Sequence, residues 1–145
     1  MRNPFSTARA LALVTASAVL ALGAPALAQP KTTFRVLVAS ISSKGSDVDP
    51  ALKSMAEDFK KTGLPYTSFK LVRSVSVGLA PGETEAVKLP SGTAHFTFVK
   101  VEGNAVRLKV AAPFSTSEYS ITTGGEIYID AGAHGATKVF LAVKR

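Results

Sequence analysis

The feature that most constrains this fold is the alternation of apolar and polar residues, which runs through most of the chain after Pro65. A period of two is typical of β-strands that have one face in a core. It predicts strands over residues 68–79, 83–89, 94–101, 105–112, 119–123, 126–130 and 138–144. In residues 68–79 the odd positions are apolar except at Arg73, so they are expected to line one buried face.

Residues 33–41 and 138–144 are apolar on both faces. Such strands usually lie in the middle of a sheet that is covered on both sides. We therefore expect these two strands, one near each end of the chain, to pair with each other. Two short turn signals, Glu102–Asn104 and Gly124–Gly125, indicate hairpins between the strands that flank them.

One segment has helical spacing, with Leu52, Met55, Ala56 and Phe59 on one face. Asp49 precedes Pro50, an order that suits an N-cap carboxylate followed by the first helical residue. Gly63 and Pro65 are expected to end the helix. Asp47 is then expected to be a solvated loop residue near the positive end of the helix.

One helix and seven or eight strands predict an α+β fold. We expect a mostly antiparallel twisted sheet or a small sandwich, with the helix covering one face. No repeat or linker divides residues 29–145, so they are expected to form one domain.

The N-terminus has the pattern of a secretory signal peptide. Arg2 and Arg9 precede an apolar run over residues 10–22, and Ala26-Leu27-Ala28 supplies a cleavage motif. The run is shorter than the roughly 20 residues that a spanning helix needs. We expect cleavage near Ala28, no transmembrane segment in the product, and a periplasmic or secreted protein of a bacterial envelope.

Cleavage would leave 117 of the 145 residues, enough for one core. Removing Arg2 and Arg9 from the seventeen basic residues leaves fifteen against ten acidic residues, a formal charge of +5. Cysteine is absent, so the fold depends on apolar burial and not on disulfides.

The chain offers few residues for catalysis. It has no cysteine nucleophile, no G-x-S-x-G elbow and two histidines, His95 and His134. His95 is expected at a strand rim or partly buried, whereas His134 lies in a glycine-rich loop four residues after Asp130. A small hydrolase that uses His134 with Asp130 and a nearby hydroxyl is therefore one alternative function.

Metal ligands and cofactor motifs are also scarce. A zinc site needs three or four converging ligands, and the oxygens near Asp47 and Asp49 lack calcium-loop spacing. We therefore predict no metal and no cofactor.

A candidate binding surface lies on the hairpin around residues 102–104. Lys100, Arg107 and Lys109 belong to its two strands and are expected to share a mildly basic face. Alternating charges on an outer strand face are also normal solvation. Aromatic residues do not alternate with these cations, so nucleic acid is not the expected partner.

The run from Phe34 to Glu83, continued by "VEGNAVRLKV" and "GGEIYI", resembles small exported bacterial proteins of uncharacterised function. The resemblance implies an α+β envelope protein and transfers no catalytic motif. The expected function is a non-enzymatic binding or accessory module that engages an envelope protein or an anionic envelope component. A carrier of an apolar ligand, held in a cavity between strand layers, is a further alternative.

Overall fold

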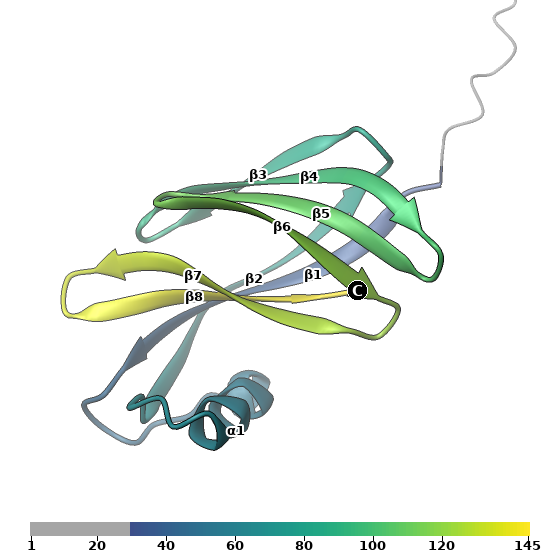
Figure 1. Ribbon diagram of the computed structural model, residues 1–145. Helices are drawn as coiled ribbons and strands as arrows, with labels where there is room; N and C mark the ends of the chain where they lie inside the picture. The colour runs from purple at the N-terminus through teal and green to yellow at the C-terminus, as the bar shows by residue number, and fades with distance from the viewer. Residues whose placement is uncertain (1–29) are drawn as a thin grey trace, which may run out of the picture.

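The structure, a computed structural model, describes residues 30–145, so the predicted leader lies outside the described part. Eight strands form two four-stranded sheets that are antiparallel throughout, and a short helix lies against one of them (Figure 1). The strands are β1 (Thr32–Ser42), β2 (Ser68–Leu79), β3 (Thr84–Leu89), β4 (Gly92–Glu102), β5 (Ala105–Ala112), β6 (Ser115–Thr122), β7 (Glu126–His134) and β8 (Thr137–Lys144). The predicted mostly antiparallel fold with one covering helix is confirmed, in the form of a sandwich of two sheets.

The first sheet has the strand order β2-β1-β8-β7, and we call it the helix-side sheet. Its central pair confirms the predicted contact between the two strands that are apolar on both faces, because Val36 lies opposite Val143 and Val38 opposite Leu141. The second sheet has the order β3-β4-β5-β6, and we call it the open sheet.

Apolar burial divides into two layers. Between the sheets lie Phe34, Phe96, Phe98, Leu108 and Leu141, each at most 1% exposed. On the other side of the helix-side sheet, Leu37, Ala39 and Ile41 of β1 pack against the helix. Because the side chains of a strand alternate between its faces, β1 contributes to both layers, which explains its continuous apolar sequence.

The prediction that all odd positions of residues 68–79 line one face was wrong. Val38 pairs with Arg73 and Ala39 pairs with Leu71, so Val72 is an extra residue that forms a β-bulge. One extra residue reverses which face the following side chains occupy. Phe69 and Leu71 therefore pack toward the helix, whereas Val75, Val77 and Leu79 pack between the sheets.

The helix forms where the sequence predicts it. A 3₁₀ turn over Pro50–Leu52 leads into α1 (Lys53–Lys61), and Asp49 caps the start. The Asp49 carboxylate Oδ1 accepts a hydrogen bond of 2.9 Å from the backbone N–H of Ala51. Phe59 is 4% exposed and lies among four aromatic rings, those of Tyr66, Phe69, Tyr128 and Phe140.

Two strands, β6 and β7, extend four residues beyond their predicted bounds. Residues 115–118, which precede the predicted strand over residues 119–123, belong to β6, where they pair with the end of β5. The expected glycine-rich loop around His134 is largely strand, because β7 continues to His134 after an irregularity between Asp130 and Ala133. Gly132, at that irregularity, has a φ of +93°, which glycine adopts readily.

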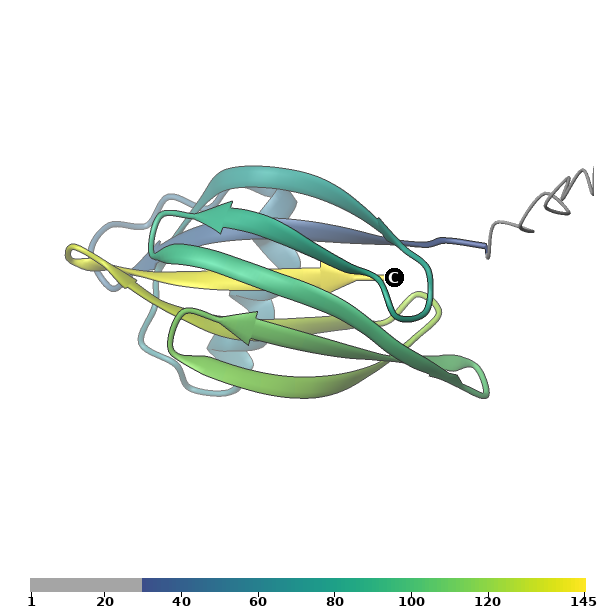
Figure 2. The same ribbon diagram turned by 90° about the horizontal axis from the view of Figure 1, so that it is seen from above.

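The outer face of the open sheet is bare. Helix α1 lies on the opposite side of the molecule, and within residues 30–145 no element covers this face, which is turned toward the viewer in Figure 2. Helix α1 thus covers part of the outer face of the helix-side sheet, where Arg35, Ser74 and Ser76 remain exposed, and the open sheet exposes a whole face to solvent.

Candidate functional site

The predicted basic residues lie together on the outer face of the open sheet. Lys100 of β4 is directly opposite Arg107 of β5, and Lys109 is two residues further along β5 on the same face. Side chains two apart on a strand share a face, so the sequence placed these three residues correctly relative to one another.

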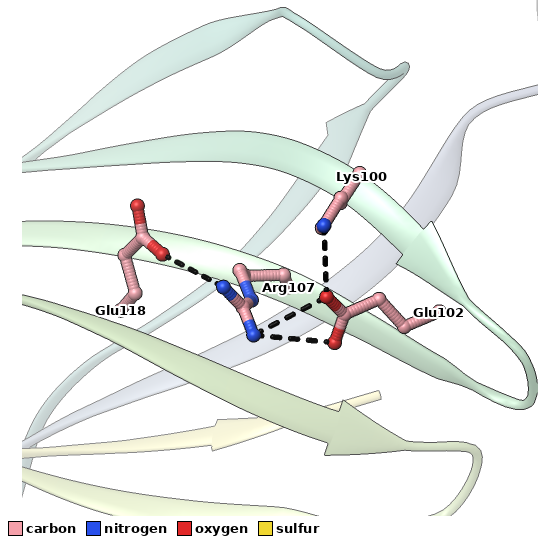
Figure 3. A network of polar contacts seen from close by, with 4 residues as sticks. All are labelled: Lys100, Glu102, Arg107 and Glu118. Atoms are coloured by element: carbon pink, nitrogen blue, oxygen red, sulfur yellow. Dashed lines mark hydrogen bonds and ion pairs between the residues drawn. The ribbon is translucent and has the colours of Figure 1, made fainter.

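Carboxylates bind two of these cations (Figure 3). Glu102 Oε1 lies 3.2 Å from Lys100 Nζ and 3.2 Å from Arg107 Nη2, so one carboxylate bridges both. Glu118 Oε2 of β6 lies 3.5 Å from Arg107 Nη1. Because these side chains are between 34% and 58% exposed, solvent screens the pairs and each stabilises the fold only slightly.

Lys109 is in a different situation. It lies opposite Thr97 of β4 and Glu118 of β6, and it forms no ion pair among residues 30–145. Lys88 of β3 shares the face, since it alternates with the buried residues Val87 and Leu89. The sequence reasoning did not include Lys88, although its alternation with apolar neighbours was visible.

Asp130 and His134, the residues of the alternative hydrolase function, form hydrogen bonds with other residues and not with each other. Asp130 Oδ2 accepts a hydrogen bond of 2.8 Å from Lys138 Nζ, and Oδ1 accepts one of 2.9 Å from the Gly132 N–H. Burial alone would raise the pKa of Asp130, but these two hydrogen bonds outweigh it and the pKa is lowered. The Asp130 carboxylate raises the pKa of Lys138 in turn. His134 is exposed, and its backbone oxygen accepts a hydrogen bond from Thr137.

A residue that the sequence reasoning missed lies beside this pair. Phe114, in the turn between β5 and β6, is 78% exposed, the highest value among the large exposed apolar residues. One edge of its ring lies against Gly132, where a Cβ atom would collide with ring atoms Cδ2 and Cε2. The sequence feature that could have identified Phe114 is an aromatic residue directly after Pro113, at a turn position where polar residues or glycine are usual.

Phe114 also lines an open hollow of about 430 Å³, together with Ser115, Asp130, Gly132, Ala133 and Lys138. The neighbouring turns hold this end of the sandwich together. Ser91 Oγ, in the turn between β3 and β4, donates a hydrogen bond of 2.6 Å to the Ala131 carbonyl of β7. Because Phe114 and Ser115 belong to the open sheet and its turn, whereas Asp130 and Lys138 belong to the helix-side sheet, residues of both sheets line the hollow.

A hollow of about 550 Å³ lies on the helix side and is lined by Val48, Pro50, Lys53, Ala56, Glu57 and Lys60. It is outside the strand layers, and the space between the sheets is filled by apolar side chains. The helix is fixed to the sheet beneath it by a hydrogen bond of 2.8 Å from the Tyr128 hydroxyl to Asp58 Oδ2. Burial, and secondarily this bond, raises the pKa of Tyr128.

Other candidate ligands remain apart. In the described residues no group of three or more His, Asp or Glu side chains is placed to hold a metal ion. Asp49 serves as a helix cap, and the backbone oxygen of Asp47 accepts a hydrogen bond from the Phe69 N–H. His95 is exposed on the outer face of β4, between Ala86 and Ala111.

No helix in residues 30–145 is long and apolar enough to cross a membrane. Comparison with known proteins finds no matching family model, no similar curated protein and no similar solved structure.

Proposed function

We propose that this protein is an exported, non-enzymatic binding module of the bacterial cell envelope, and that it binds an anionic envelope glycan with the outer face of the open sheet. The observation that carries the proposal is the excess of positive charge on this uncovered face. Four cations, Lys88, Lys100, Arg107 and Lys109, stand against two carboxylates, Glu102 and Glu118. Such a surface attracts polyanions at low ionic strength.

The character of the face favours a glycan over a membrane. Peripheral membrane surfaces combine cations with large apolar side chains that enter the headgroup region. The middle of this face carries Ala86, Thr97, Ala111 and Ser120 between the charged residues. These short side chains leave a shallow platform around His95, and the His95 imidazole and the hydroxyl groups of Thr97 and Ser120 suit an extended chain of sugars.

Export to the envelope is supported by the sequence. The basic start, short apolar run and A-x-A motif before Gln29 are typical of a secretory leader.

The sharpest test is a substitution that should strengthen binding, because misfolding does not explain a gain. Glu102→Gln releases Lys100 and Arg107 from their shared carboxylate. Its matched control, Glu57→Gln, removes the same charge from the exposed side of α1 on the opposite side of the molecule. Affinity for polygalacturonate, a soluble carboxylated polysaccharide, is measured by calorimetry in low salt.

We expect Glu102→Gln to bind about three- to tenfold more tightly than the unmodified protein, a range set by the strength of exposed ion pairs. Glu57→Gln should not change the affinity, and about 0.5 M salt should abolish the difference. Equal effects of both substitutions, or no binding at all, would refute the proposal. Binding to phosphatidylglycerol vesicles but not to polygalacturonate would assign the face to a membrane instead.

A further inference from the structure

We propose that the hollow beside Phe114 is a second binding site, which takes one pyranose ring of a glycan. It stands on different residues from the proposed polyanion face and does not require a charged ligand. A pyranose has an apolar face of C–H groups and an edge of hydroxyl groups. A site for it needs an open aromatic ring with hydrogen-bonding groups at the edge of that ring.

Phe114 supplies the ring. Gly132 lies at one edge of the ring, because a Cβ atom there would be within 2.5 Å of Cδ2 and Cε2 but 3.8 Å from Cζ. The remainder faces solvent, since the residue is 78% exposed. A large apolar side chain at a tight turn breaks the usual preference for small polar residues there, and such local conflicts are expected at functional sites.

The backbone of β7 is shaped to receive this ring. Gly132 has a φ of +93° and lies at the irregularity in the pairing of β7 with β8. Only a residue without a Cβ leaves room for the ring at this distance. The absence of a Cβ at Gly132 therefore lets the Phe114 ring lie against β7.

Asp130 and Lys138 supply the polar edge, and both line the same hollow as Phe114. Their contact of 2.8 Å fixes the two groups relative to each other. Each keeps capacity for a ligand, because a carboxylate has about four acceptor positions and an ammonium has three donors. A sugar hydroxyl can donate to Asp130 and another can accept from Lys138. The Ser115 hydroxyl lies at the same hollow.

The size of the hollow is consistent with one sugar ring. Its volume of about 430 Å³ is near the lower end of the roughly 300–1,000 Å³ range of small-molecule sites. Because the hollow is open, a longer chain can extend beyond it in either direction. Binding of a single ring on one aromatic face should be weak, with a Kd of about 1 mM.

The test uses neutral oligosaccharides, so that the cationic face of the open sheet makes no contribution. Cellotetraose and chitotetraose are titrated to about 10 mM into ¹⁵N-labelled protein, and the amide shifts are followed by NMR. We expect saturable shifts at Ser115, Gly132 and Ala133 for at least one sugar. The absence of shifts at these amides with both sugars would overturn the proposal.

Two substitutions separate stacking from mere packing. Phe114→Tyr keeps an aromatic ring and should keep binding within about threefold, whereas Phe114→Leu keeps an apolar side chain without the ring and should weaken binding about tenfold or more. Because the side chain is exposed, both variants should fold, which unchanged shifts in β1 and β8 would verify. Equal affinity of the two variants would also overturn the proposal. Glu102→Gln should leave the sugar affinity unchanged, so the failure of either site is distinguishable from failure of the other.

Discussion

The role of α1 can be tested with one substitution, Phe59→Ala. Phe59 is 4% exposed, and its ring centroid lies 5.0 Å from that of Phe140 and 5.5 Å from that of Tyr128. Removing a buried phenylalanine costs about 3–5 kcal/mol of unfolding free energy, through lost apolar transfer and the cavity left behind. Because the total stability of such a domain is about 5–15 kcal/mol, this loss should lower Tm by about 10–20 °C.

Phe114→Ala is the matched control, because it makes the same chemical change at an exposed site. With 78% of the residue in solvent, it buries about a fifth of the roughly 200 Å² that a phenylalanine can bury. At about 25 cal/mol per Å², its loss should cost about 1 kcal/mol or less. The two substitutions should therefore differ about threefold or more in their effect.

The assay is urea-induced unfolding followed by far-UV circular dichroism, with both variants compared at a constant m value. Helix α1 is then an integral layer of the fold if Phe59→Ala shows the larger loss. A loss below about 1.5 kcal/mol for Phe59→Ala, or an equal loss for Phe114→Ala, would show that the aromatic cluster does not anchor the helix.

Three further predictions concern single residues. Gly132→Ala should lower stability by up to about 1 kcal/mol more than Gly135→Ala, because both have positive φ but only the former would push the exposed Phe114 ring aside; equal losses in urea unfolding would contradict the contact. Burial, and secondarily Asp58, raises the pKa of Tyr128. The neutral phenol therefore stabilises the fold fully below about pH 10, and this stabilisation is lost as the pH rises above that value. In an ultraviolet titration of the three tyrosines, Tyr128→Phe should remove the ionisation step above the ordinary range, and the persistence of that step would refute the assignment. Burial would raise the pKa of Asp130, but the hydrogen bonds from Lys138 and Gly132 outweigh burial and lower it. The ionised Asp130 carboxylate therefore stabilises the fold fully above about pH 4, and this stabilisation is lost as the pH falls through the lowered pKa. Lys138→Met should raise that pKa in an NMR titration, and an unchanged value would show that Lys138 does not set it.

Period and capping chemistry made much of this fold predictable from the sequence. The central pairing of β1 with β8 followed from two segments that are apolar on both faces. The start of the helix followed from Asp49 and Pro50, because a cap is a local interaction that needs no knowledge of the rest of the chain.

The errors came from features that local patterns do not record. The extra residue Val72 shifts the pairing of β2. The odd-numbered apolar residues before Val72 therefore pack toward the helix, and those after it pack between the sheets. Likewise, β7 continues through residues 131–134 because β8 pairs with it across a bulge, although the composition resembles a loop. A register shift is fixed by the partner strand, and a single sequence does not identify that partner.

The candidate surfaces were also predictable only where a local pattern determines them. Alternation placed Lys100, Arg107 and Lys109 on one face, but the bridging role of Glu102 depends on the hairpin geometry. The hollow beside Phe114 joins residues from a turn of one sheet and from two strands of the other. Such a convergence of distant segments follows from how the two sheets pack.

The most direct test of the central claim is an amide map of the polyanion contact. ¹⁵N-labelled protein is titrated with polygalacturonate, and shifts are compared between the outer face of the open sheet and α1. Our account predicts salt-sensitive shifts at Thr97, Lys109 and Ser120, with Lys53–Lys61 unchanged. Shifts confined to the helix side, or none on either side, would contradict it.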